Sequence, residues 1–235
     1  MHSAETQRRQ YLDAMGITLW ERRAAPVVHA DAPVVAPIVE PVARSVVVPE
    51  SNSDWTGLEE SVRACTKCAL HTTRTQTVFG VGNRQAEWLF VGEAPGADED
   101  RQGEPFVGRA GQLLNAMLAA LGLKREQVYI ANVLKCRPPN NRDPQPNEVE
   151  QCEPYLVRQI ELIRPKLIVA LGRHAAHSLL KTDLALARLR GQRLSYHNIP
   201  LVVTYHPAYL LRTPSDKRKA WEDLRRARAL LAEQA

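Results

Sequence analysis

The stretch WLFVGEAPGADEDRQGEPFVGRAG, residues 88–111, places four apolar side chains directly before a turn rich in glycine and acidic residues. Such continuous apolar runs are typical of strands buried on both faces of a sheet. Residues 92–111 contain five glycines and five carboxylates. A glycine-rich turn after a strand often binds phosphate through backbone N–H groups, but carboxylates would repel that anion. Because the Walker and GxGxxG patterns are also absent, the sequence disfavours a nucleotide-phosphate site.

Outward from this stretch, apolar runs alternate with helical patterns. Strands are expected at 88–92, 128–134, 167–171 and 199–204, and helices at 110–121, 147–163, 173–180 and 215–232. Buried strands separated by helices favour a mostly parallel sheet covered on both faces. Asn147 and Glu150 form a capping pattern at the start of the second helix. The sequence therefore predicts an α/β fold of three layers.

Polar segments follow each of the expected strands. They are GEAPG (92–96), NVLKCRPP (132–139), LGRHAAH (171–177) and YHPAYLLR (205–212). Ligands of parallel α/β sheets bind beyond the carboxyl ends of the strands. The four segments are therefore expected to converge on one site.

Composition limits the classes of function and the compartment. The chain has 235 residues, a formal net charge of +5 and 44% hydrophobic residues, which are enough for a real core. The basic balance agrees with a polyanion partner without requiring one. No long apolar run and no secretion signal is present, so we expect no membrane segment and a cytoplasmic protein.

The chain divides into three parts by composition. Residues 1–23 contain a short amphipathic pattern, SAETQRRQYLDAMGITLWERR, that is too small to form its own core. Residues 24–52 are rich in Ala, Val and Pro, with five prolines and no glycine between Ala24 and Glu50, which is typical of a semi-rigid linker. Residues 53–235 are expected to form the globular domain.

Four cysteines suggest a metal site. Cys65 and Cys68 form a CxxC pair, while Cys136 and Cys152 lie far along the chain. In a reducing compartment such thiols are more often ligands than disulfides. They suit either one tetrahedral zinc ion or one [4Fe-4S] cluster, and the spacing leaves both open.

Together, GEAPGADEDRQGEPFVGRAG, NVLKCRPPNNR, HPAYLLR and the four cysteines closely resemble the family 4 uracil-DNA glycosylases, the iron-sulfur branch of that superfamily. The resemblance covers about residues 55–232. It implies an α/β/α fold with a central four-stranded, mostly parallel sheet, a [4Fe-4S] cluster on the four cysteines, and excision of uracil from DNA. We expect a monomer that acts on uracil-containing DNA.

Base recognition requires stacking and hydrogen bonds to a flipped uracil. Phe106 is the expected stacking ring, with a core phenylalanine as the alternative. Asn132 can accept from uracil N3–H and donate to O4, although an asparagine that only turns a strand end would look the same. In the family pattern Glu99 stands against C5 and excludes the thymine methyl group; the alternative is a solvated acid.

Cleavage of the glycosidic bond generates a cationic sugar and a uracil anion, so the site needs charges of both kinds. His206 is expected to donate to uracil O2, with a turn histidine bonded to backbone as the alternative. Glu93 is expected to position water and stabilise the cation, with a helix-cap contact as the alternative.

Contacts to the DNA backbone are expected from basic residues near the site. Leu210 or Leu211 would fill the gap left by the flipped base. Phosphate contacts are assigned to Arg212, Lys135, Arg137 and Arg142.

Residues 3–23 resemble the N-terminal peptide of the DNA polymerase III psi subunit, which docks on the clamp-loader chi subunit. The resemblance implies that partner here and supplies an alternative function, a replisome adaptor whose glycosylase-like domain binds DNA without catalysis. A pure binder has no need for Glu93, Phe106, Asn132 and His206 together, so the sequence favours the enzyme.

Overall fold

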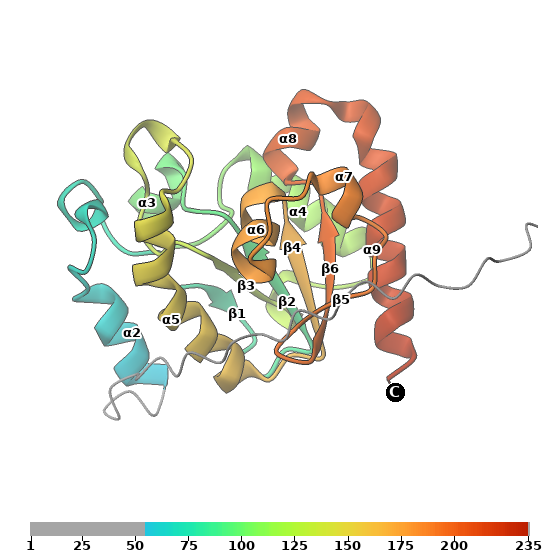
Figure 1. The fold of residues 1–235 in the computed structure, drawn as a ribbon, viewed down its shortest axis with the longest axis horizontal. Coiled ribbons are helices and arrows are strands. Elements are labelled where there is room, and N and C mark those ends of the chain that lie inside the picture. Colours follow the sequence, from blue (N-terminus) through green and yellow to red (C-terminus); the bar gives the residue numbers. More distant parts are fainter. Residues whose placement is uncertain (1–54, 235) are drawn as a thin grey trace, which may run out of the picture. The chain divides into compact units, whose positions relative to one another are not determined.

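A computed structural model describes residues 55–234 (Figure 1). The proposed docking peptide, residues 1–23, and the linker, residues 24–52, lie outside the described residues. No helix between residues 55 and 234 combines the length and apolar character needed to span a bilayer.

Within the described residues the sheet has six strands in the order β1-β3-β2-β4-β6-β5. The central four are parallel: β3 (Tyr129–Asn132), β2 (Trp88–Gly92), β4 (Leu167–Leu171) and β6 (Ile199–Thr204). All residues of β2, β3 and β4 are buried, as their continuous apolar sequences require. The prediction of a central four-stranded parallel sheet is confirmed.

Two short antiparallel strands, β1 (Val81–Gly82) and β5 (Leu194–Tyr196), extend the edges of this sheet. The sequence did not predict them, because segments of two and three residues are too short to show a period.

Helices cover both faces of the sheet (Figure 1). Leu89 and Val91 point to one face and pack with residues of α5 (Pro146–Ile163) and α6 (Arg173–Leu180). Phe90 points to the opposite face and packs with residues of α4 (Arg109–Ala120) and α9 (Lys217–Ala232). This alternation follows the two-residue period of a strand and confirms the three-layer prediction.

Shorter helices complete the described part. They are α2 (Trp55–Arg63), α3 (Ala97–Gln102), α7 (Leu186–Leu189) and α8 (Pro207–Arg212). Helix α5 begins one residue before the predicted start, and its capping pair is Gln145 with Glu148, not Asn147 with Glu150. The reason is Pro146, which fits the first helical position because it has no N–H to satisfy.

Candidate active site and cysteine pocket

The predicted uracil pocket would lie where β2 and β3 end side by side, with Gly92 paired to Asn132 in the parallel register. A Cβ on Gly92 would lie 2.3 Å from Asn132 Oδ1 and 2.7 Å from the Phe106 ring, so only glycine leaves this space open. Asn132 Oδ1 is the sole buried side-chain nitrogen or oxygen between residues 55 and 234 that lacks a hydrogen-bond partner. Leaving such an acceptor unpaired costs free energy, which a ligand with an N–H donor would recover.

The ring of Phe106 forms one wall of this pocket. Phe106 is 6% exposed and adopts a φ of 56°, in the left-handed region that non-glycine residues rarely occupy. Glu99 holds the surrounding loop: its Oε1 accepts hydrogen bonds from Val107 N (2.9 Å) and Gly108 N (3.2 Å), and its Oε2 accepts from Gly96 N (3.1 Å). The strained backbone at Phe106 is therefore fixed by a neighbouring carboxylate.

Glu99 also anchors its own loop, a role that the sequence did not predict. Both of its carboxylate oxygens are engaged by backbone N–H groups of that loop. A carboxylate bound in this way helps determine where the loop and the Phe106 ring lie, and it is itself held in one position. Its contact with C5 of the base stays a prediction.

His206 lies next to Phe106, with the ring centroids 5.6 Å apart. Its Nδ1 accepts a hydrogen bond from Ala208 N at 3.1 Å and caps α8. Burial lowers the pKa of His206 to about 4, so the ring is neutral at pH 7. Because Nδ1 is the acceptor, the proton of the neutral ring is on Nε2. The backbone bond that the sequence offered as the alternative is thus observed, and donation from Nε2–H to uracil O2 is compatible with it and stays a prediction.

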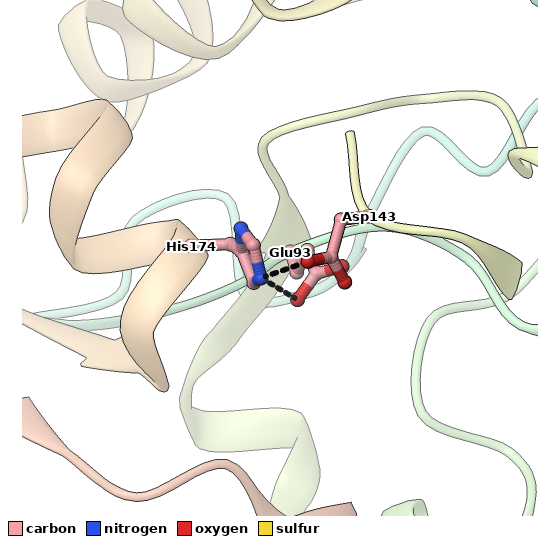
Figure 2. Close-up of side chains that lie close together, drawn as sticks. All are labelled: Glu93, Asp143 and His174. Atoms are coloured by element: carbon pink, nitrogen blue, oxygen red, sulfur yellow. Dashed lines mark ion pairs between the residues drawn. The ribbon is translucent and has the colours of Figure 1, made fainter. Parts of the chain in front are cut away.

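Glu93 follows β2 and meets two side chains from other segments (Figure 2). Its Oε2 lies 3.9 Å from His174 Nε2, and the same nitrogen lies 3.3 Å from Asp143 Oδ2. Burial, together with the negative charge of Asp143, raises the pKa of Glu93 to about 7, while Arg173 opposes this shift. The sequence placed His174 in a polar segment at this edge of the sheet but gave no role to it or to Asp143.

The predicted wedge and phosphate ligands separate into exposed and buried residues. Leu210 is 1% exposed and belongs to the core, so it cannot enter DNA, whereas Leu211 is half-buried and Arg212 is exposed. Arg137 is partly exposed and its Nε donates to Asn141 Oδ1. Arg142 is also partly exposed; it donates from two nitrogens to the carboxylate of Glu148 and so anchors the start of α5, and its phosphate contact stays a prediction.

The prediction that Lys135 binds a phosphate is wrong. Lys135 is 1% exposed, and its Nζ donates to the backbone oxygen of Asn132 at 2.8 Å and to Gln159 Oε1 at 2.6 Å. It therefore holds the end of β3, where Asn132 lies. The sequence could not reveal this, because Gln159, which accepts from Nζ, lies 24 residues further along the chain.

Replacing Lys135 with methionine is expected to lower the melting temperature by roughly 4–12 °C, because it leaves two buried oxygens without their donor at a cost of about 2–4 kcal/mol. Thermal unfolding of the purified protein measures the change. Lys124→Met, at an exposed lysine, is the matched control. Equal melting temperatures in both variants would contradict the structural role of Lys135.

The four cysteines line a single pocket, together with Arg74, Lys135 and Tyr155. Cys65 and Cys68 are partly buried, and Cys136 and Cys152 are buried. Arg74 Nη1 donates to Cys136 Sγ at 3.1 Å, and Lys135 N donates to Cys152 Sγ at 3.2 Å. The ammonium of Lys135 also lies among these thiols. Such donors and a buried cation would stabilise thiolates, so the pocket fits a thiolate-bound metal group.

Comparisons with known proteins agree with this geometry. The model of the uracil DNA glycosylase superfamily matches residues 79–225. A type-4 uracil-DNA glycosylase from Archaeoglobus fulgidus is 51% identical over 173 residues, which cover 70% of this chain and 87% of that protein. Another from Thermotoga maritima is 44% identical over 178 residues, covering 74% and 93%. A type-5 uracil-DNA glycosylase from Pyrobaculum aerophilum is 33% identical over 146 residues, covering 55% and 64%.

Proposed function

The chain belongs to the uracil-DNA glycosylase superfamily and, within it, to the type-4 enzymes, and from this we propose that it hydrolyses the N-glycosidic bond of uracil in DNA and leaves an abasic site. The observation that carries the proposal is the buried, unpaired Oδ1 of Asn132 beside the Phe106 ring. A buried acceptor without a partner favours a ligand with an N–H at that point.

We propose that uracil enters this pocket as a flipped base. Flipping costs a few kcal/mol, and stacking on Phe106 would return about 1–3 kcal/mol. Uracil N3–H would donate to Asn132 Oδ1, and the amide N–H₂ would donate to O4. Exclusion of thymine is assigned to the loop that Glu99 holds against the base, because a rigid wall resists an additional methyl group better than a mobile one.

The glycosidic bond then breaks between C1′ and N1, and its electron pair leaves with uracil. The Nε2–H of His206 would donate to uracil O2, where negative charge accumulates. Ionised Glu93 would stabilise the positive sugar and orient water, whose oxygen bonds to C1′ while its proton passes to the carboxylate. A carboxylate with a pKa of about 7 is suited to accept that proton near neutral pH.

We propose that Cys65, Cys68, Cys136 and Cys152 hold a [4Fe-4S] cluster. When bound, it supplies iron–thiolate bonds that cross-link three segments: the one after α2, the one after β3, and α5. Lys135 joins this pocket to the uracil site, because its backbone N–H bonds Cys152 and its ammonium bonds Asn132. The cluster would therefore support the geometry of the site.

Incubation of the purified protein with a labelled oligonucleotide carrying one uracil, followed by alkaline cleavage, tests the activity. Strand breaks at uracil, with free uracil released, are expected. Matched oligonucleotides with thymine or cytosine at that position should remain intact. An absence of breaks in protein with a full brown chromophore would overturn the proposed function.

Leu211→Ala is expected to lower the rate on double-stranded uracil DNA about tenfold and to change the rate on single-stranded DNA little, because only a duplex leaves a gap for a wedge. Leu210→Ala instead removes a core contact and should destabilise the protein by about 2–5 kcal/mol. Rates on both substrates, with thermal unfolding, distinguish the two. Equal losses on both DNA forms in Leu211→Ala would exclude the wedge.

Exposed Arg212 and the partly exposed Arg137 and Arg142 remain proposed phosphate ligands. Docking of residues 3–23 on a clamp-loader chi subunit, a monomeric state and a cytoplasmic location also remain proposals, supported by the sequence alone. The adaptor alternative gains no support, because the relatives compared above carry the names of glycosylases.

A further inference from the structure

Two segments bring charged side chains around Glu93, which follows β2. Asp143 comes from the loop between β3 and α5, and Arg173 and His174 come from the first turn of α6. Figure 2 shows the His174 ring turned toward both carboxylates. Glu93 and His174 are 27% and 26% exposed, whereas Asp143 is 70% exposed. The two partly buried groups thus depend on each other and on their charged neighbours.

We propose that His174 and Asp143 are positioning residues that hold the guanidinium of Arg173 near Glu93 and, together with Arg173, set how much of the Glu93 carboxylate is ionised during the glycosylase reaction. This inference rests on the proposed function and on the role given to Glu93 there. It adds residues that the sequence left without a role.

The position of His174 gives both protonation states of its ring a partner. Its Nε2 lies 3.0 Å from Arg173 Nη2 and 3.3 Å from Asp143 Oδ2. A neutral ring accepts from the guanidinium through Nε2, and a protonated ring donates to Asp143. Burial lowers the pKa of His174 against the opposing effect of Asp143, which favours the neutral ring at pH 7.

The charges that act on Glu93 oppose each other. Asp143 raises its pKa by repulsion and Arg173 lowers it by attraction, while burial adds the largest upward shift. The pKa of His174 is also lowered by His177, and His174 in turn lowers the pKa of His206. Arg173 Nη2 is also 3.4 Å from Asp143 Oδ2. Arg173, which favours the ionised form of Glu93, is therefore held by Asp143, which opposes it.

A bound cation explains this cluster less well. Ligand atoms of Glu93, Asp143 and His174 lie within 4.8 Å of one another. However, the guanidinium of Arg173 lies against the His174 nitrogen that would have to bind the ion. A positive group at that point would repel a metal ion, so the arrangement favours a network of protons and charges.

Only ionised Glu93 can stabilise a cationic sugar and accept a proton from water, so activity should rise with pH through about 7. Single-turnover rates at saturating DNA between pH 5 and 9 measure this profile. Asp143→Asn should move its midpoint to lower pH by about half a unit, and Arg173→Gln should move it to higher pH by a similar amount. Asp183→Asn, at a remote exposed acid, is the matched control and should not move it.

His174→Ala should lower the plateau rate about tenfold, because Arg173 loses the acceptor that holds it near Glu93, and His174→Gln, which keeps a side-chain acceptor, should restore part of that loss. A ¹³C-NMR titration of the Glu93 carboxyl group measures its protonation midpoint in each variant and does not depend on the glycosylase reaction. Unmoved midpoints in both the rates and the titration would overturn the inference while leaving the function intact. An inactive wild-type protein whose Glu93 midpoints still shift would instead overturn the proposed function.

Discussion

Asn132→Ala is expected to lower the single-turnover rate of uracil excision by about 10²–10³-fold at saturating DNA. The variant removes the acceptor for N3–H and the donor for O4 at the same time. These contacts matter more than usual, because Asn132 is buried and its Oδ1 has no hydrogen-bond partner within residues 55–234. Uracil would then lose both of the hydrogen bonds proposed for it at the end of β3.

The same substitution should leave the free energy of unfolding nearly unchanged. Removing an amide whose oxygen is already unpaired eliminates a desolvation penalty, and this offsets the small loss of packing. Thermal unfolding measured beside the rates tests this combination. Asn115→Ala, at an exposed asparagine of α4, is the control for both measurements. Retained activity would exclude the assigned pocket, and a large loss of stability would make Asn132 a structural residue.

The sequence predicts the central sheet well because the buried strands consist almost entirely of apolar residues. The runs WLFV and LIVAL contain apolar residues alone, which suits strands that are buried on both faces. A parallel sheet brings the carboxyl ends of its strands to one edge. This predicts that Gly92 and Asn132 lie side by side and that His174, after β4, lies at the same edge. Strand β1 (Val81–Gly82) could not be predicted in this way, since two residues are too few to show a hydrophobic pattern.

The direction of individual side chains limits what the sequence can predict about the site. Leu210 and Leu211 are indistinguishable as letters, but α8 turns the first into the core and leaves the second at the surface. Lys135 resembles a phosphate ligand until its segment directs it toward Gln159, far along the chain. The sequence also does not show that the loop folds back, so that its backbone N–H groups donate to the carboxylate of Glu99. Each outcome depends on partners distant in sequence.

His206 has two functions on two ring nitrogens, and substitutions can separate them. Nδ1 caps α8 by accepting from Ala208 N, while Nε2–H is proposed to stabilise the uracil anion. His206→Asn keeps a side-chain acceptor at a position where asparagine is a favoured cap, but its shorter amide does not reach as far as Nε2. His206→Ala removes both functions.

Both variants are expected to lose about 10²–10³-fold in single-turnover rate, because each lacks the donor to O2. Only His206→Ala should also lose about 0.5–2 kcal/mol of stability, the usual cost of an absent cap. Rates and denaturant unfolding of the two proteins, measured at pH 7, provide the comparison. If His206→Asn were as active as wild type, Nε2 would have no part in the chemistry.

The titration of His206 provides a third signature. Its pKa is lowered by burial from 6.5 in the unfolded chain to about 4 in the folded protein, so the unfolded state binds the proton first as the pH falls. The contribution of neutral His206 to stability is therefore complete above pH 6.5 and is lost between there and about 4. His206→Asn should lose less stability than wild type between pH 7 and 5. An identical loss in the two proteins would mean that the ring is not held neutral by burial, and the assignment of its proton to Nε2 would fail with it.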